Sequence, residues 1–395
     1  MKNRRFTSCV LTLFAALACS ADCIAQTTLP ETKIQRIVTD SAEISATTLP
    51  VAKAGPSAGK RNARLQVVAL IYATPPAGIV LTRDGRMFLS FPRWGDRVDY
   101  SCVQILEGKP SAFPDVKTHR EADHKDRLFS VQGMDFDDHG RLWLLDTNNS
   151  RLRAYNPRSR EILARIKLPP EVTRGGIYAN DVRVTTRAGA SGGGYAFISD
   201  SVTGGVIVVD IAEGAAWRRL KDHPASEAEN DFVANVEGEP LMHRAGKNEW
   251  PMRGNTDGIA LSPDGKTLYF TPFSSRSLYS ASVRALTDRT VGDDTAAATV
   301  KKLASKSSAN DGICTDEEGR VYTTDYEDGA IRRWTPGSES FETIVQDERI
   351  LWPDAVWVHE GYVYFTTNQL NRIASLHRGK DLREQPFSVM RYPVK

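Results

Sequence analysis

Four aspartates stand at equivalent points of an internal repeat, where they could act together. Each is found where an apolar segment begins, and two of them directly follow an asparagine. The candidate ligand-binding residues are Gln132, Asn180, Asp181, Asp257, Asn310, Asp311 and Asp354. Carboxylates that converge on one point repel each other, which raises some of their pKa values unless a cation or hydrogen-bond donors compensate. The pattern therefore indicates a protonated amine, a hard cation such as Ca²⁺, or a network of neighbouring loop amides.

The repeat that positions these residues has four parts. An apolar strand leads to a polar turn ending in glycine, then to a second apolar or aromatic strand and a small polar cluster. The six turn glycines are Gly85, Gly140, Gly194, Gly265, Gly319 and Gly361. Four strands recurring about every 40–55 residues are typical of propeller blades. The sequence therefore predicts an all-β fold, a six-bladed β-propeller with four-stranded antiparallel blades.

The chain before the first repeat reads as a leader and a linker. Basic residues followed by an apolar run predict a secretory signal peptide over 1–25. Residues 26–63 are rich in Thr, Ala, Ser and Pro and predict a flexible linker, with the propeller occupying 64–395. The apolar segment 65–71 has no partner in the first repeat. We expect it to pair beside 387–392 and to close the ring.

The leader predicts a secreted or periplasmic protein. Its apolar run is too short for a membrane span, and no later stretch is long enough. A lipoprotein anchored at Cys19 is the competing interpretation. Outside the leader only Cys102 and Cys314 remain, which do not make a disulfide framework. We expect two buried thiols, although a single bridge between them stays open.

The charge balance and the absent motifs exclude several classes. Removing 1–25 takes three of the 51 basic and one of the 49 acidic side chains, which leaves 48 of each. A neutral chain has no bulk field that attracts nucleic acid, so we expect no nucleic-acid partner. There is no zinc-binding His spacing, P-loop or dinucleotide fingerprint. The G-x-S-x-G match at 189–193 falls between two strands rather than in a strand–turn–helix elbow.

The repeat also predicts where the acids lie. The innermost strand of each blade begins beside the central channel, so we expect the four aspartates at one shared mouth. Trp352 and Trp357 are candidates for an aromatic wall, with a core role favoured for Trp357. The aspartates that end second strands, Asp146, Asp200 and Asp325, are expected to cap turns on the opposite face.

Several segments, in order from about residue 75 to 380, resemble the royal jelly/Yellow protein family in a bacterial, exported form. They are GRLWLLDT (140–147), YANDV (178–182), AFISDS (196–201), DGIALSPDGKTLY (257–269), SSRSLY (274–279), WPD (352–354) and TNQL (367–370). The resemblance implies a six-bladed propeller with a ligand-binding channel. Members of the family include secreted proteins that bind amines in this channel and proteins credited with dopachrome conversion.

The chain is also distantly similar to the gluconolactonase/regucalcin propellers. That similarity implies Asn180, Asp257 and Asp311 as ligands of a divalent metal such as Ca²⁺. However, Pro76, Ala77 and Gly78 stand where those enzymes place a glutamate.

Three functional hypotheses follow. The first is an exported propeller that binds a small cationic or aromatic ligand in its central channel. The alternative is a metal-dependent lactonase-type hydrolase or dopachrome-type isomerase that uses the channel Asp and Asn residues. The third is a protein-interaction platform, which rests on analogy with other propellers. Whether the protein is an enzyme stays open at this point.

Overall fold

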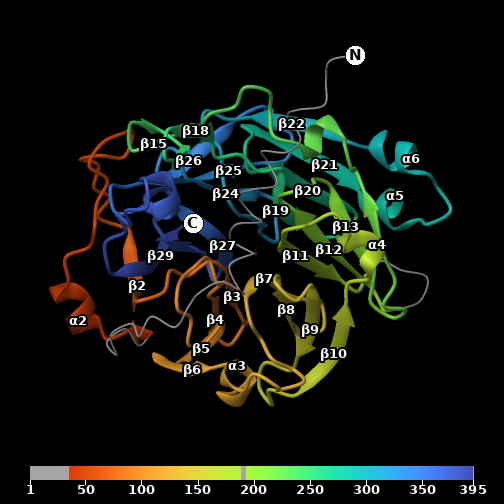
Figure 1. Cartoon of the computed structure of the whole chain (residues 1–395), viewed down its shortest axis with the longest axis horizontal. Coiled ribbons are helices and arrows are strands. Elements are labelled where there is room, and N and C mark those ends of the chain that lie inside the picture. Colours follow the sequence, from red (N-terminus) through yellow and green to blue (C-terminus); the bar gives the residue numbers. More distant parts are fainter. Residues whose placement is uncertain (1–34, 188–192, 395) are drawn as a thin grey trace.

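The computed structural model describes residues 35–187 and 193–394, in which six antiparallel sheets form the blades of a propeller. Inner strand first, they are β3 (Ile79–Leu81), β4 (Met87–Ser90), β5 (Cys102–Leu106) and β6 (Lys109–Ala112); β7 (Val131–Phe136), β8 (Leu142–Asp146), β9 (Arg151–Tyr155) and β10 (Ile162–Lys167); β11 (Ala179–Thr185), β12 (Tyr195–Asp200), β13 (Val206–Asp210) and β14 (Ala216–Arg219); β19 (Thr256–Leu261), β20 (Thr267–Pro272), β21 (Ser277–Ser282) and β22 (Lys301–Ser305); β23 (Ile313–Thr315), β24 (Val321–Asp325), β25 (Ala330–Trp334) and β26 (Phe341–Gln346); β27 (Pro353–His359), β28 (Tyr362–Thr367), β29 (Phe387–Pro393) and β2 (Gln66–Tyr72). Figure 1 shows the inner strands gathered near the centre and β6 and β10 at the periphery. The predicted six-bladed propeller is confirmed.

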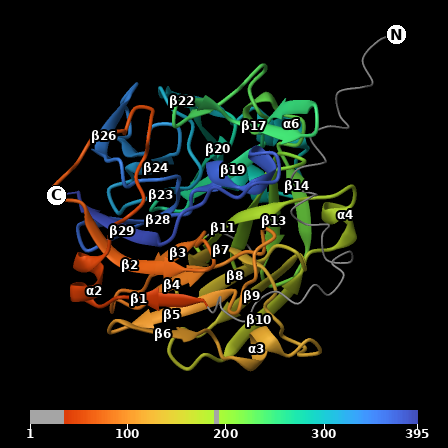
Figure 2. The same ribbon diagram turned by 60° about the vertical axis from the view of Figure 1, so that its left-hand side comes forward.

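The last blade is built from both ends of the chain. Strand β2 pairs antiparallel with β29, with Leu70 opposite Ser388 and Ile71 opposite Phe387. The predicted ring closure is therefore confirmed, and Figures 1 and 2 show orange β2 beside blue β29. A further strand, β1 (Arg36–Val38), pairs with the other edge of β2. The closure removes an edge at which other chains could pair.

Ordered structure begins upstream of the predicted propeller start. Besides β1, the segment contains α2 (Ser41–Ala46), and the backbone N–H of Ala52 donates to Glu348 O at 2.7 Å. The folded part of the chain therefore starts earlier than residue 64. The predicted signal peptide over 1–25 lies outside the described residues.

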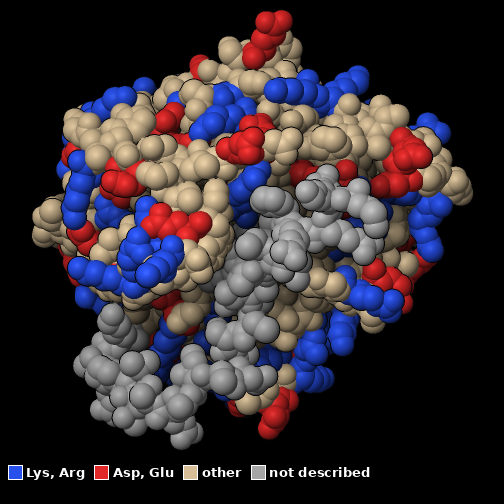
Figure 3. Space-filling view, turned by 45° about the horizontal axis from the view of Figure 1, so that its top comes forward, with Lys and Arg blue, Asp and Glu red and all other residues tan. Residues whose placement is uncertain are grey.

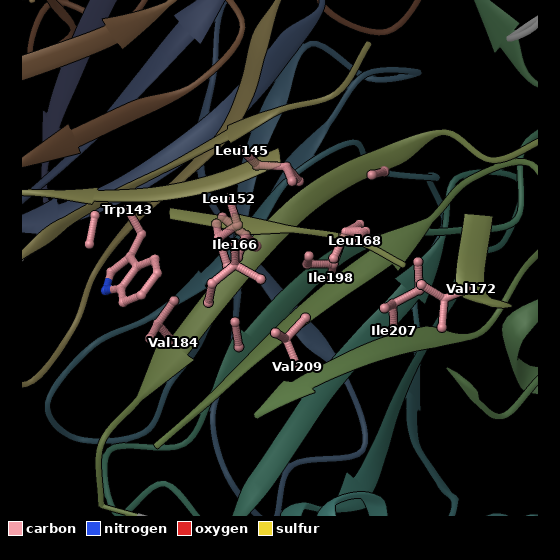
Figure 4. Close-up of a cluster of buried hydrophobic side chains, with 14 residues drawn as sticks. Trp143, Leu145, Leu152, Ile166, Leu168, Val172, Val184, Ile198, Ile207 and Val209 are labelled. Atoms are coloured by element: carbon pink, nitrogen blue, oxygen red, sulfur yellow. The ribbon is translucent and has the colours of Figure 1, made fainter. Parts of the chain in front are cut away.

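The hydrophobic core lies between neighbouring blades. Figure 4 shows the cluster between the second and third blades, to which Trp143, Leu152, Ile198 and Ile207 belong. All four side chains are fully buried. Some middle strands are covered on both faces and have a short continuous apolar run, as in Val206–Asp210, whereas others, such as Ala330–Trp334, include arginines.

Hydroxyl groups join neighbouring blades at the hub at five of the six junctions. A Ser or Thr at or just after the end of a second strand donates to a backbone carbonyl at the start of the next inner strand. The bonds are Ser90 to Gln132 O, Thr147 to Ala179 O, Ser201 to Thr256 O, Thr324 to Asp354 O and Thr366 to Ala77 O, at 2.6–3.2 Å. The small polar cluster of the repeat thus satisfies carbonyls that the inner strands leave unpaired.

The two ends of the propeller differ. We call the end where inner strands begin the start face, and the end with the hairpins between inner and second strands the turn face. Val131 pairs with Asp146 and Ala179 with Asp200. These aspartates therefore lie on the start face, and their predicted position on the opposite face is wrong, because an antiparallel second strand ends where the inner strand begins. Asp146 accepts hydrogen bonds there from two backbone amides, Phe129 N and Ser130 N, each at 3.0 Å.

An insertion over residues 221–254 covers the start face. It forms two small hairpins, β15 (Asn235–Val236) with β16 (Glu239–Pro240) and β17 (Met242–Ala245) with β18 (Asn248–Pro251). Its Leu241 and Met252 pack in one buried cluster with Tyr326 and Trp352. A segment without the repeat pattern therefore closes one end of the propeller.

The remaining helices are short. They are α3 (Lys117–Arg120), α4 (Pro170–Thr173), α5 (Val283–Thr287), α6 (Asp293–Ala297) and the 3-10 turns η1 (Pro224–Ser226), η2 (Leu370–Arg372) and η3 (Ala374–Leu376). No described helix has the length and apolar character that crossing a membrane requires. Cys102 and Cys314 are buried free thiols, as expected. In the face shown in Figure 3, basic and acidic side chains are interspersed.

Candidate functional site

Six of the seven predicted site residues surround one cavity on the propeller axis. This inner cavity has a volume of about 40 Å³, and Gln132, Asn180, Asp181, Asp257, Asp311 and Asp354 line it. Such a volume holds on the order of one to three water molecules. Asn310 does not line the cavity: its Nδ2 donates to Thr271 Oγ1 at 3.1 Å. The repeat therefore brings all four aspartates together.

The glycines that follow two of these aspartates explain how the strands come so close. A Cβ atom on Gly258 would lie 2.6 Å from the carbonyl oxygen of Asp311, and one on Gly312 would lie 2.6 Å from that of Asp354. Any side chain at these positions would push neighbouring inner strands apart. The glycines of these Asp-Gly pairs thus allow neighbouring inner strands to approach closely at the hub, rather than forming a turn.

A directed chain of hydrogen bonds ends on Asp257. Trp94 Nε1 donates to Tyr178 Oη at 2.7 Å, and that hydroxyl donates to Gln132 Oε1. Gln132 Nε2 donates to Asn180 Oδ1 at 2.6 Å, and Asn180 Nδ2 donates to Asp257 Oδ1 at 2.8 Å. Because an indole N–H can only donate, Trp94 fixes the direction of every later bond. Asn180 therefore presents its amide nitrogen, not its oxygen, to the carboxylate.

Asp311 and Asp354 each have one neutral hydrogen-bond donor. Trp352 Nε1 donates to Asp311 Oδ2 at 2.8 Å, and Asn368 Nδ2 donates to Asp354 Oδ2 at 2.6 Å. Among the described residues, no Lys, Arg or His forms an ion pair with Asp257, Asp311 or Asp354. We call these three side chains the central acids. Their negative charge has no built-in counter-ion.

Burial and mutual repulsion shift the central acids toward the neutral form. Loss of hydration, together with the carboxylates of the neighbouring aspartates, holds the pKa of Asp257 and of Asp354 well above the ordinary value. Burial raises the pKa of Asp311 to about 7, against the opposing hydrogen bond from Trp352. Burial and mutual repulsion thus favour the neutral carboxyl at this site more than at an exposed aspartate.

Asp181 differs from the central acids because it has its own cation. Arg183 Nη1 lies 2.6 Å from Asp181 Oδ1. Burial raises the pKa of Asp181, and Arg183 opposes that shift. Arg183 Nη2 also donates to Ile313 O at 2.8 Å, which fixes the guanidinium. The pair is close to neutral, so the negative charge available to a ligand comes from the central acids.

Three stacked rings lie over the site on the start face. Trp352 and Tyr326 stack with centroids 4.4 Å apart, and Tyr326 and Phe273 with centroids 5.0 Å apart. We call these residues the aromatic cover, and each is at most 2% exposed. Asp257, Asp311 and Asp354 are themselves only 3–8% exposed. The acids therefore lie beneath a closed start face, and their predicted position at an open mouth is wrong.

A second, larger cavity opens on the turn face. This vestibule has a volume of about 730 Å³ and takes lining residues from all six blades. Arg183 and Trp357 line both the vestibule and the inner cavity, so they stand at the boundary between the two. Trp357 is half-buried and packs against two core clusters, in line with the favoured core role, and one side of it also lines the two cavities. In the vestibule, burial raises the pKa of the Asp135 carboxyl to about 7.

The residues predicted to hold a metal do not offer a complete ligand set in this arrangement. Asn180 directs an N–H at Asp257, and its oxygen accepts from Gln132, whereas Ca²⁺ is held by oxygen ligands. Within residues 35–187 and 193–394, no group of three or more His, Cys, Asp or Glu side chains is placed to hold a metal ion. The metal site stays a prediction, which the calcium titration below tests.

Sequence reasoning did not single out four residues that hold the site. They are Trp94, Tyr178, Arg183 and Asn368. Asn368 lies just beyond the second strand of its blade, in the polar cluster of the repeat, which was a usable signal. Trp94 lies between β4 and β5, outside the repeat pattern, and nothing in the sequence points to it.

Replacing Tyr178 with Phe tests the directed chain. The variant leaves the buried Gln132 oxygen and the Trp94 N–H without their shared partner, so we expect a loss of about 1–3 kcal/mol in unfolding free energy. Chemical denaturation measures it. The matched control is Tyr279→Phe, because that hydroxyl makes no hydrogen bond in the described part of the chain. Equal stability of the two variants would contradict this chain of hydrogen bonds.

Known proteins were compared with this chain in sequence and in structure. A family model described as major royal jelly protein matches residues 129–395. Protein yellow of Drosophila yakuba is 26% identical over 262 residues, which are 59% of this chain and 47% of that protein. Protein yellow of Drosophila erecta is likewise 26% identical, over 233 residues, which are 53% of this chain and 41% of that protein. The chain thus spans about half the length of the curated relatives it matches.

Two solved structures have a similar fold. A gluconolactonase from Xanthomonas campestris is 12% identical with a TM-score of 0.49, and the match covers 87% of this chain and 98% of that chain. A candidate gluconolactonase is 15% identical with a TM-score of 0.50, and the match covers 87% of this chain and 98% of that chain. At 15% identity, the likeness to the second structure shows the fold alone.

Proposed function

The chain belongs to the major royal jelly protein family, and from this premise we propose that it is an exported propeller that binds a small organic cation in its central channel. The carrying observation is the cluster of Asp257, Asp311 and Asp354, which lines one cavity and has no ion-pairing cation among the described residues. Export rests on the predicted leader over 1–25. N-terminal sequencing of the mature protein tests it.

An ammonium group suits this cavity better than a larger cation. Asp311 and Asp354 each have one oxygen held by a neutral donor of the protein, whereas Asp257 accepts from Asn180 at Oδ1 and from Ser201 at Oδ2. An ammonium group donates up to three hydrogen bonds, one for each carboxylate. Charge-assisted bonds of this kind are about twice as strong as neutral ones. The cavity of about 40 Å³ accepts the head group alone.

Calorimetric titration with methylammonium at pH 8 tests the proposal. With two non-hydrogen atoms and a ceiling of about 1.5 kcal/mol each, we expect a Kd of roughly 10 mM. Asp354→Asn removes one of the three charges and is expected to weaken binding at least about tenfold. The control Asp264→Asn changes an exposed aspartate in a hairpin turn and leaves binding unchanged. Equal binding by the two variants would contradict the proposal.

Calcium is the competing occupant. Titration of the full chain with CaCl₂, after treatment with a chelator, separates the two ligands. If the channel holds an ammonium ion, methylammonium binds after chelation and Ca²⁺ does not compete with it. Tight Ca²⁺ binding that Asp257→Asn abolishes would instead support the metal site predicted from Asn180, Asp257 and Asp311.

A second candidate is an acid–base enzyme of the hydrolase or isomerase type. The observation that favours it is the pKa of about 7 for Asp311, and likewise for Asp135, because general acids and bases work best near the operating pH. Assays of lactone hydrolysis and dopachrome isomerisation, with and without Ca²⁺, test it. Turnover that is unchanged in Asp311→Asn would rule out the role of that carboxyl.

A further inference from the structure

We propose that the turn-face vestibule is the entrance to the channel and holds the body of the bound amine, while its ammonium group lies at the central acids. The inference rests on the proposed function and adds the ligand's route, orientation and shape. The proposal places the opening of the channel on the turn face. The repeat pattern puts the leading acids at the other end, at the start face.

The start face offers no passage in this structure. The indole N–H of Trp352 is bonded to Asp311 at 2.8 Å, and its ring lies 4.4 Å from that of Tyr326. Met252 of the insertion, 1% exposed, packs in the same cluster. A ligand entering from this side would have to separate stacked rings and break the bond that holds one of its own binding carboxylates.

The volumes of the two cavities indicate which part of the ligand each of them can hold. The inner cavity of about 40 Å³ is too small for more than a head group. The vestibule of about 730 Å³ lies within the usual range of ligand pockets, roughly 300–1,000 Å³. The body of any larger amine must therefore extend toward the turn face. The expected ligand is elongated, with an ammonium group at one end. The carbons next to that group meet Trp357, and the far end meets a lining with charged side chains of both signs, such as Arg187 and Asp316.

The boundary between the cavities suits such a ligand. Arg183 is held by Asp181 and by Ile313 O, so a cation passes a nearly neutral pair rather than a free positive charge. Trp357 packs edge-on against Phe136, with centroids 6.2 Å apart. Because Trp357 also lines both cavities, its ring is placed to contact the first carbons behind the ammonium group.

The test compares two amines in three proteins by calorimetry at pH 8. In wild type, 2-phenylethylammonium is expected to bind on the order of 30- to 100-fold more tightly than methylammonium, because its phenyl ring contacts Trp357 at the inner end of the vestibule. Trp357→Ala is expected to reduce this ratio several-fold. The matched control Phe232→Ala removes a ring from the cluster on the start face and is expected to keep the ratio.

The outcomes separate this inference from the proposed function. If methylammonium does not bind to wild type, the proposed function fails. If it binds but Trp357→Ala keeps the full ratio, or Phe232→Ala lowers it, the route through the vestibule is wrong. A second variant, Glu317→Trp, alters an exposed position of the vestibule lining and spares the core. It is expected to slow association of 2-phenylethylammonium, and an unchanged rate would also overturn the inference.

Discussion

The double variant Asp257→Asn/Asp311→Asn is expected to lose amine binding by about 10²–10⁴-fold. Hydrogen bonds to charged groups contribute roughly 1.5–3 kcal/mol each, and two of them convert to this range. Asparagine has nearly the same shape as aspartate and can still accept from Asn180 and Trp352. The loss therefore reports charge rather than packing. Calorimetry with 2-phenylethylammonium at pH 8 measures it.

The same variant is expected to be more stable than wild type at high pH. Burial raises the pKa of Asp311 from 3.8 to about 7, so the folded state prefers the neutral carboxyl. That contribution to stability is fully present below about pH 4 and is lost as the pH rises through about 7. An amide stays neutral throughout. Thermal melts without ligand should therefore show a higher Tm for the variant at pH 8 and little difference at pH 4.

The result that would contradict this reading is a variant that melts below wild type at pH 8. It would mean that the ionised acids are compensated within the apo protein. The single variant Asp264→Asn serves as control for the loss of one surface charge, since that side chain is more than half exposed. It is expected to shift the melting curve little at either pH.

The variant Ile71→Asp is expected to destabilise the fold by about 4 kcal/mol or more, because it buries an unpaired charge in the closing strand. Ile71 is fully buried and lies between Ile37 of β1 and Phe387 of β29. Without this strand the ring opens and β29 exposes an unpaired edge. Denaturant unfolding measures the stability, and sedimentation measures association through the free edge.

The matched control is Gln66→Asp, in the same strand. Gln66 is exposed and pairs with Arg391 near the end of the ladder, so its change is expected to fall within about 0.5 kcal/mol of wild type. A monomeric Ile71→Asp protein with the stability of this control would show that β2 does not hold the ring closed.

Most of the fold could be predicted from the repeat because every blade has the same order of strands and turns. Six hairpins, the pairing of β2 with β29 and the family resemblance were all predicted correctly. The convergence of Asp181, Asp257, Asp311 and Asp354 also followed from their equivalent positions. Residues at equivalent positions of the repeat lie at equivalent positions around the propeller axis, whatever their residue types.

Two errors arose where the repeat carries no information, and a third concerned strand direction within the repeat. The insertion over 221–254 has no counterpart in other blades, so its packing over the start face was not predictable from the pattern. The face assigned to Asp146 was wrong because strand direction was not followed through the hairpin. Asn310 shares the repeat position of Asn180, yet Thr271 draws its amide away from the cavity. Side-chain direction depends on such single neighbours.

The most direct test of the central claim is a crystal structure with bound 2-(4-bromophenyl)ethylammonium, in which anomalous scattering locates the bromine. The account predicts an ammonium nitrogen within hydrogen-bonding distance of Asp257, Asp311 and Asp354, with the bromine in the vestibule beyond Trp357. A bromine beneath the insertion on the start face would contradict the route. A ligand found only at the outer surface, with the three carboxylates untouched, would contradict the binding site itself.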